Sequence, residues 1–134
     1  MAQMSATRNP AASILIVDDD EAVTQTFAQM LRMEGFTVRT AISAESGLTE
    51  AAENKPDAII LDLRMPAIDG LAFLKRLRAS EGQHRTPVAV VTGDYFLDDQ
   101  LSAELRQLGA ELKFKPLWID DLISLAHSLL KVTL

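Results

Sequence analysis

Four apolar residues, Ala58 to Leu61, lead directly into the carboxylate of Asp62, and this stretch constrains the fold more than any other. A short uninterrupted apolar run is typical of a strand buried on both faces, as in a parallel sheet. Asp62 then lies at the carboxyl end of that strand, where open α/β sheets bind ligands. By itself, Asp62 is equally well explained as a turn or helix-capping residue, so its meaning depends on the ends of the other strands.

The chain alternates between strand-like and helix-like segments five times. Strands are expected at residues 13–17, 36–41, 58–62, 87–92 and 111–114. Apolar residues at helical spacing predict helices at about 23–34 (closed by Gly35 as C-cap), 43–54, 69–79, 97–108 and 117–131. This alternation predicts an α/β fold: an open doubly wound five-stranded parallel sheet, flavodoxin-like, of order 2-1-3-4-5, with helices on both faces. A closed barrel would need about eight such units.

Bulk composition excludes several classes of protein. The 134 residues suffice for one domain, and their hydrophobic content of 48% argues against disorder. The absence of Cys excludes disulfides and thiolate chemistry, and the net charge of −6 argues against direct binding to nucleic acid. No apolar stretch approaches the roughly 20 residues of a membrane span. We therefore expect a cytoplasmic protein with a flexible N-terminal arm over 1–12 and one domain over 13–134.

Polar residues follow four of the five expected strands at their carboxyl ends. They are Asp18 and Asp19 after the first strand, Asp62 on the third, Thr92 on the fourth and Lys115 after the fifth. In a parallel sheet these ends share one edge, and the order 2-1-3-4-5 places the first and third strands side by side. Three carboxylates, a hydroxyl and an ammonium are therefore expected to converge.

Such a constellation favours metal-assisted phosphoryl chemistry. Converging carboxylates repel one another and raise each other's pKa, and a divalent cation relieves the repulsion. Because only oxygen ligands are available, we expect a hard cation, Mg²⁺. A carboxylate beside Mg²⁺ can attack a phosphoryl group, whose oxygens need charge neutralisation. Lys115 and Thr92 can supply part of it, and Gly93 leaves room for the group to enter.

These residues resemble the motifs of a response regulator receiver domain of two-component signalling, similar to chemotaxis regulators. The matching segments are Leu15–Asp19, Asp62–Pro66 with Gly70, Val91–Gly93 and Lys115–Pro116, and the resemblance covers roughly residues 13–132. It implies a signalling switch that catalyses its own phosphorylation and dephosphorylation, not a turnover enzyme. Asp62 would take the phosphoryl group from a phosphohistidine of a sensor histidine kinase or a phosphotransfer protein.

The resemblance also implies how metal and phosphoryl group are bound. Asp19 and Asp62 would bind Mg²⁺ directly, with the backbone carbonyl of Arg64, and Asp18 would act through a metal-bound water. The catalytic residues Thr92 and Lys115 would bind phosphoryl oxygens.

Binding of the phosphoryl group would change the surface near the last two βα units. A downstream output protein would recognise that change, and a homodimer that forms on phosphorylation is a further expectation. A cis peptide bond is implied between Lys115 and Pro116. Receivers often carry an aromatic residue where this chain has Leu112, and Tyr95 and Phe96 could serve in place of that aromatic residue.

Two other classes share parts of the pattern. An aspartyl-phosphate phosphatase usually has a second acid two residues after its nucleophile, where this chain has Arg64. A flavodoxin-like cofactor binder needs a phosphate loop after the first strand, where this chain has the acidic run Asp18–Glu21. Both stay as alternatives, and the sequence fits a stand-alone receiver or a fragment of a longer regulator.

Two surface features carry further predictions. Arg64 and Asp94 flank the mouth of the expected site with opposite charges, so they can pair across it. The last helix has a wider apolar face than one core contact needs, which indicates either a docking surface or a deeply buried helix.

Overall fold

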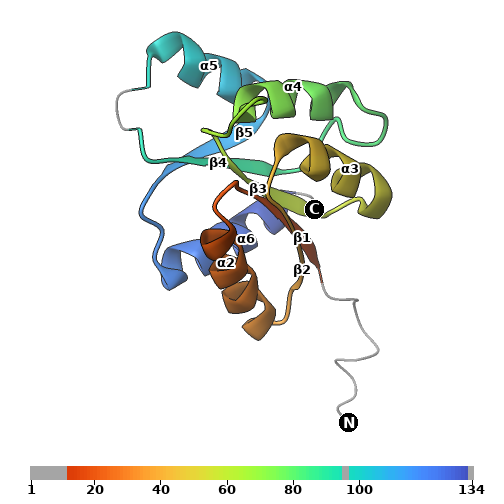
Figure 1. Ribbon diagram of the computed structural model, residues 1–134, viewed down its shortest axis with the longest axis vertical. Coiled ribbons are helices and arrows are strands. Elements are labelled where there is room, and N and C mark those ends of the chain that lie inside the picture. Colours follow the sequence, from red (N-terminus) through yellow and green to blue (C-terminus); the bar gives the residue numbers. More distant parts are fainter. Residues whose placement is uncertain (1–11, 95–96, 133–134) are drawn as a thin grey trace.

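The computed structural model describes residues 12–94 and 97–132, which form one parallel sheet between two layers of helices (Figure 1). The elements are β1 Ser13–Val17, α2 Glu21–Met33, β2 Thr37–Ala41, α3 Ala44–Asn54, β3 Ala58–Asp62, α4 Gly70–Ala79, β4 Val88–Thr92, α5 Asp99–Gln107, β5 Ala110–Phe114 and α6 Ile119–Val132. The sheet order is β2-β1-β3-β4-β5, and all neighbouring strands are parallel. This confirms the predicted open, flavodoxin-like sheet of order 2-1-3-4-5.

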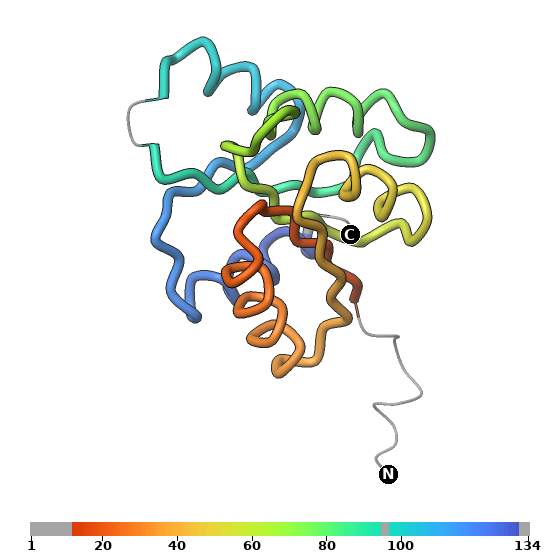
Figure 2. Tube along the Cα trace, viewed as in Figure 1, coloured from red at the N-terminus to blue at the C-terminus, as the bar shows by residue number. Residues whose placement is uncertain are grey.

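The core lies on both faces of the sheet, because alternate residues of each strand point to opposite sides. In β1, Leu15 and Val17 pack into the cluster that contains α3, α4 and α5, whereas Ile14 and Ile16 pack with α2 and α6. The Cα trace shows these two layers, with α3, α4 and α5 above the sheet and α2 and α6 below it (Figure 2). Burial on both faces explains why the strand sequences are continuous apolar runs instead of alternating ones.

The bounds of β1 and β3 are as predicted, and those of the other elements differ from the predicted ones by at most two residues. Helix α5 begins at Asp99 because the side chain of Asp98 caps it, accepting a hydrogen bond from a backbone N–H of the first turn. Strand β5 begins one residue earlier than predicted, at Ala110, because this residue pairs with β4. Gly35, predicted as the C-cap of α2, follows the actual C-cap residue Glu34 and has a φ of +100°.

Some predictions fall outside the described residues. The predicted flexible arm lies there except for Ala12, whose carbonyl accepts a hydrogen bond from the N–H of Thr37 at 2.9 Å. Tyr95 and Phe96 also lie outside the described residues. Among the helices that the structure describes, none has the length and apolar character needed to cross a membrane.

Gly70 brings the first turn of α4 against the end of β3. Its N–H donates to the carbonyl of Leu63 at 2.8 Å. A Cβ added to Gly70 would lie 2.9 Å from the carbonyl oxygen of Asp62 and 2.9 Å from the Cα of Leu63. Both are backbone atoms, so they cannot yield without displacing the strand end that carries Asp62.

We expect Gly70→Ala to lower the free energy of unfolding by about 1–3 kcal/mol, the usual cost of forcing an extra carbon into a packed site. Gly93→Ala is the matched control, because a Cβ there would meet no atom within 4 Å among the described residues other than its chain neighbours, and it should change stability by less than about 0.5 kcal/mol. Urea unfolding in the presence of a chelator measures both. Equal losses in the two variants would contradict this account of Gly70.

Candidate functional site

Three carboxylates meet at the carboxyl edge of the sheet, as the sequence predicts. The ligand oxygens of Asp18, Asp19 and Asp62 lie within 4.8 Å of one another. They meet because Val17 pairs with Leu61 in the β1–β3 ladder, so the residues that follow each are neighbours. Asp18 and Asp62 are only 5% and 7% exposed, whereas Asp19 is exposed. The cluster therefore has two buried carboxylates and one on its solvent side.

The acidic run after β1 is divided between the site and a helix cap. Asp18 accepts a hydrogen bond from the N–H of Asp20 at 3.0 Å, which fixes the turn. Asp20 is itself the N-cap of α2, and its carboxylate accepts from the N–H of Val23 at 3.2 Å. Only the first two aspartates of the run belong to the carboxylate cluster, and the third stabilises the helix that follows.

Lys115 supplies the ammonium of the site. Its Nζ lies 3.2 Å from Oδ1 of Asp62 and 3.6 Å from Oδ2 of Asp18. The backbone N–H of Lys115 donates to the carbonyl of Thr92 at 2.8 Å, so the ends of β5 and β4 are joined. The peptide bond between Lys115 and Pro116 is cis, which confirms the expectation from the resemblance.

The charges of this site are incompletely balanced. Burial, and then the charge of Asp18, raise the pKa of Asp62, and the attraction of Lys115 offsets this only in part. Burial likewise raises the pKa of Asp18 against the opposing effects of a backbone hydrogen bond and Lys115. Burial lowers the pKa of Lys115, but attraction to both carboxylates outweighs it and raises the pKa overall. Among the described residues, Lys115 is paired with two of the three clustered carboxylates, and this all-oxygen donor set fits a hard divalent cation.

Thr92 and a charged pair border the cluster. Thr92 is fully buried, and its Oγ1 accepts a hydrogen bond from the N–H of Asp94 at 3.1 Å. The carboxylate of Asp94 accepts from Nη2 of Arg64 at 2.7 Å, so the predicted pair between these residues is present. The bond from the N–H of Asp94 to Thr92 was not predicted, although threonine hydroxyls often bond to the backbone two residues further on.

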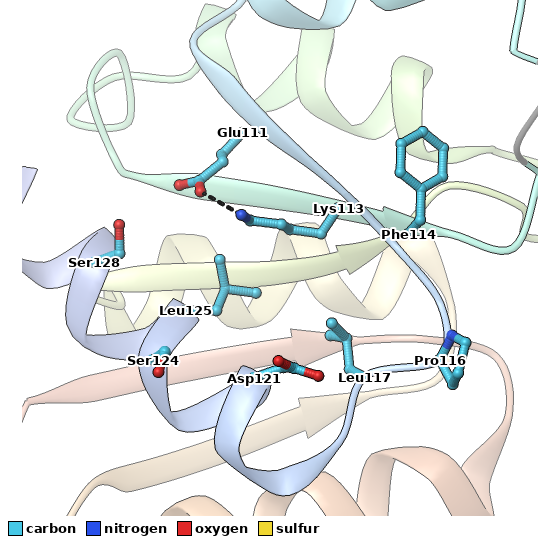
Figure 3. Close-up of a pocket in the computed structure, with 9 residues that line it drawn as sticks. All are labelled: Glu111, Lys113, Phe114, Pro116, Leu117, Asp121, Ser124, Leu125 and Ser128. Carbon is cyan, nitrogen blue, oxygen red and sulfur yellow. Dashed lines mark ion pairs between the residues drawn. The ribbon is translucent and has the colours of Figure 1, made fainter.

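A pocket of about 420 Å³ lies between β5 and α6, close to the loop that carries Lys115 (Figure 3). Glu111 and Lys113 of β5 form an ion pair of 3.2 Å on one wall, and residues of α6 form the other. The inner face of α6 is buried through Leu122, Leu125, Ala126 and Leu129. Trp118 and Ile119 at its start are 69% and 45% exposed. The helix is therefore a core helix, and a docking surface that involves it and a neighbouring element stays a prediction.

Comparisons with known proteins identify the family. Its model, described as the response regulator receiver domain, matches residues 14–126, and the chain belongs to that family. The transcriptional regulatory protein PrrA of Mycobacterium tuberculosis is 36% identical over 118 residues, which are 88% of this chain and 49% of PrrA. The response regulator MprA of Mycobacterium ulcerans is 32% identical over 123 residues, covering 90% of this chain and 50% of MprA. The chain thus spans about half the length of these curated relatives.

Solved structures agree with this assignment. The chemotaxis protein CheY4 of Vibrio cholerae matches with a TM-score of 0.82 and 27% identity, over 89% of this chain and 98% of CheY4. A putative response regulator from Chloroflexus aurantiacus matches with a TM-score of 0.80 and 31% identity, over 90% and 98% of the two chains. Receiver domains of two-component response regulators are signalling switches and not turnover enzymes, so neither alternative class is favoured.

We expect Asp62→Asn to raise the midpoint of thermal unfolding in the presence of a chelator, because it removes a buried charge that Lys115 only partly compensates. The pKa of Asp62 is raised in the folded state, so its ionisation opposes folding once the pH exceeds the unfolded value of 3.8. The gain from the variant should therefore be larger at about pH 7 than at about pH 4.

Thermal melts of both proteins at the two pH values provide the measurement. Asp98→Asn is the control, because it removes an exposed carboxylate while asparagine caps a helix equally well. A lower midpoint for Asp62→Asn at both pH values would show that the buried charge is not a source of instability.

Proposed function

We propose that this chain is a phospho-accepting switch in which Asp62 becomes an aspartyl phosphate. The observation that carries the proposal is the placement of Asp62. Its buried carboxylate lies at the edge of the sheet, 3.2 Å from Nζ of Lys115 and within 4.8 Å of two further carboxylates. A sensor histidine kinase or a phosphotransfer protein is the proposed donor, because membership of the response regulator family implies such a partner.

In the proposed transfer, an Asp62 carboxylate oxygen attacks the phosphorus of the donor phosphohistidine. The phosphorus–oxygen bond forms as the phosphorus–nitrogen bond breaks, and the bonding electrons leave with the imidazole nitrogen. Lys115 would bind one phosphoryl oxygen. The hydroxyl of Thr92 can donate its hydrogen to another, because its oxygen already accepts from Asp94. Attack by water later breaks the same phosphorus–oxygen bond, which releases inorganic phosphate and restores the carboxylate.

Asp18, Asp19, Asp62 and the backbone carbonyl of Arg64 would hold Mg²⁺ in this proposal. The support is the donor set itself, since the carboxylate oxygens cluster within 4.8 Å and one lysine is their charged partner among the described residues. Bound Mg²⁺ would neutralise charge on the carboxylates and the phosphoryl oxygens.

We propose that the phosphoryl group alters the surface through the ends of β4 and β5. Movement of the Thr92 hydroxyl towards the phosphoryl group would strain the hydrogen bond that it accepts from the N–H of Asp94. The carboxylate of Asp94 is also paired with Arg64, so both loops would be affected. Leu112, where receivers often carry an aromatic residue, packs against the core cluster that contains α5. Loop rearrangement, not rotation of a ring at that position, would then alter the surface that an output protein or a second copy of the chain recognises.

Asp62→Asn should abolish labelling by acetyl phosphate, because a carboxamide is not a nucleophile for phosphorus at neutral pH. Wild type should gain one phosphoryl group with Mg²⁺ and none with a chelator, as measured by intact mass. Asp98→Asn should be labelled like wild type. Retained stoichiometric labelling of Asp62→Asn would overturn the proposal, whereas turnover of a generic phosphate ester or bound flavin would support an alternative class.

We expect Arg64→Ala to accelerate the decay of the phosphorylated protein, because the Arg64–Asp94 pair bridges the loops after β3 and β4 and can obstruct the attacking water. The effect on stability should stay below about 1 kcal/mol, as is usual for exposed pairs. Asp94→Ala and the double variant should decay at a similar rate to Arg64→Ala. Arg39→Ala is the control, since it breaks a surface pair with Glu50 elsewhere. Decay at the wild-type rate in all variants would exclude a role for the pair.

A further inference from the structure

A second concave site lies at the opposite edge of the sheet, where β4 and β5 begin. It is a cleft of about 790 Å³. Its basic residues are Arg78 of α4, His84 and Arg85 of the following loop, and Arg106 in the last turn of α5. Leu108 supplies partly exposed apolar surface, and the buried residues Pro87, Val88 and Leu129 complete the apolar lining. We call this site the arginine cleft.

The arginine cleft concentrates positive charge on a chain whose net charge is −6. Within the described residues, no carboxylate forms an ion pair with Arg78, Arg85 or Arg106. The acidic residue at the cleft, Glu111, is paired with Lys113 at 3.2 Å. The three guanidinium groups therefore have no carboxylate counter-ion in the part of the chain that the structure describes.

Arg78 is held in place by backbone carbonyls. Its Nε donates to the carbonyl of Leu108 at 2.7 Å, and its Nη1 donates to the carbonyl of Gln83 at 3.0 Å. Nη2 has no acceptor among the described residues, and it lies 3.4 Å from the position that a Cβ of Gly109 would occupy. Burial lowers the pKa of Arg78, so a bound anion would compensate a half-buried charge. The two carbonyls thus orient the guanidinium and leave one donor edge for a ligand.

A purely structural role accounts for only part of this arrangement. It explains why Arg78 ties α4 to the end of α5 through Leu108. It does not explain why Arg85 and Arg106 line the same cleft, since both are exposed and their side chains make no hydrogen bond in the described part of the chain. Three arginines around one hollow give the planar, bidentate donors that phosphate oxygens favour.

We propose that the arginine cleft binds a small phosphorylated ligand of the nucleotide class. The guanidinium groups would hold the phosphates, and the apolar wall and the flat face of an arginine would accommodate the base. The volume falls in the range of about 300–1,000 Å³ typical of small-molecule sites. The charges converge on a hollow and are not spread along a stripe as for nucleic acid. The site is separate from Asp62, so it is independent of the proposed phosphotransfer.

Titration calorimetry with the full chain, in chelator and at about 0.15 M salt, tests the proposal. The probes are ATP, AMP, inorganic phosphate and adenosine. We expect ATP and AMP to bind at one site, and phosphate alone and adenosine alone to bind at least about tenfold more weakly, since each offers only part of the contacts. Arg85→Gln and Arg106→Gln should each weaken AMP binding by about tenfold, the effect of losing one charge-assisted contact. Arg76→Gln, on the exposed side of α4 and outside the cleft, should bind like wild type.

The outcomes against the proposal are distinct. It fails if neither ATP nor AMP binds, or if Arg76→Gln weakens binding as much as Arg106→Gln, which would indicate diffuse attraction to surface charge. It also fails if Asp62→Asn abolishes AMP binding, because the ligand would then lie at the carboxylate cluster. Labelling of Asp62 by acetyl phosphate is measured separately. A lack of nucleotide binding at the arginine cleft would therefore not contradict the proposed phosphotransfer.

Discussion

The parallel pairing of β1 with β3 is the constraint on which the carboxylate site depends. Val17 lies opposite Leu61, so Asp18 and Asp62 leave the sheet at the same height. A slip of one residue would turn every side chain of the strand to the opposite face, and both faces are packed. The apolar core therefore holds the carboxylates together although their mutual repulsion opposes it. Packing of the whole sheet, not attraction within the site, brings these charges close.

That arrangement opposes folding, because two of the clustered carboxylates are buried. The raised pKa of Asp18 and Asp62 means that their ionised forms destabilise the folded state, so a gain in stability does not explain their burial. Buried carboxylates of this kind are common at functional sites. Lys115 relieves part of the repulsion, and the remaining imbalance is what a divalent cation and a phosphoryl group would use. Supporting contacts around the site limit its freedom. Gly70 holds the loop after β3 close to Asp62, and the bond between the backbones of Lys115 and Thr92 fixes the other side.

The two edges of the sheet gather different charged groups. The carboxyl edge gathers aspartates from the ends of β1 and β3, and the amino edge gathers arginines from helix ends and a loop near the starts of β4 and β5. Strands β4 and β5 connect the two sites. They begin at the arginine cleft, and at the carboxyl edge Thr92 ends β4 and Lys115 follows β5. The fold thus separates the carboxylate cluster, where we propose that Mg²⁺ and a phosphoryl group bind, from the arginine cleft at the other end of the same strands.

Local signals in the sequence determined the strands and the edge at which Asp62 and Lys115 meet, and the strand order followed from the common order of doubly wound sheets. They sufficed because apolar runs reveal buried strands, and a parallel sheet brings all carboxyl ends to one edge. Only the tertiary structure decided that Asp18 is buried while its neighbour Asp19 is exposed, since burial depends on what packs above each side chain. It also determined that the arginine cleft forms, since the residues of that cleft come from helix ends and a loop. Such segments have no periodic pattern, so their side chains are brought together only by the packing of α4 and α5 on the sheet.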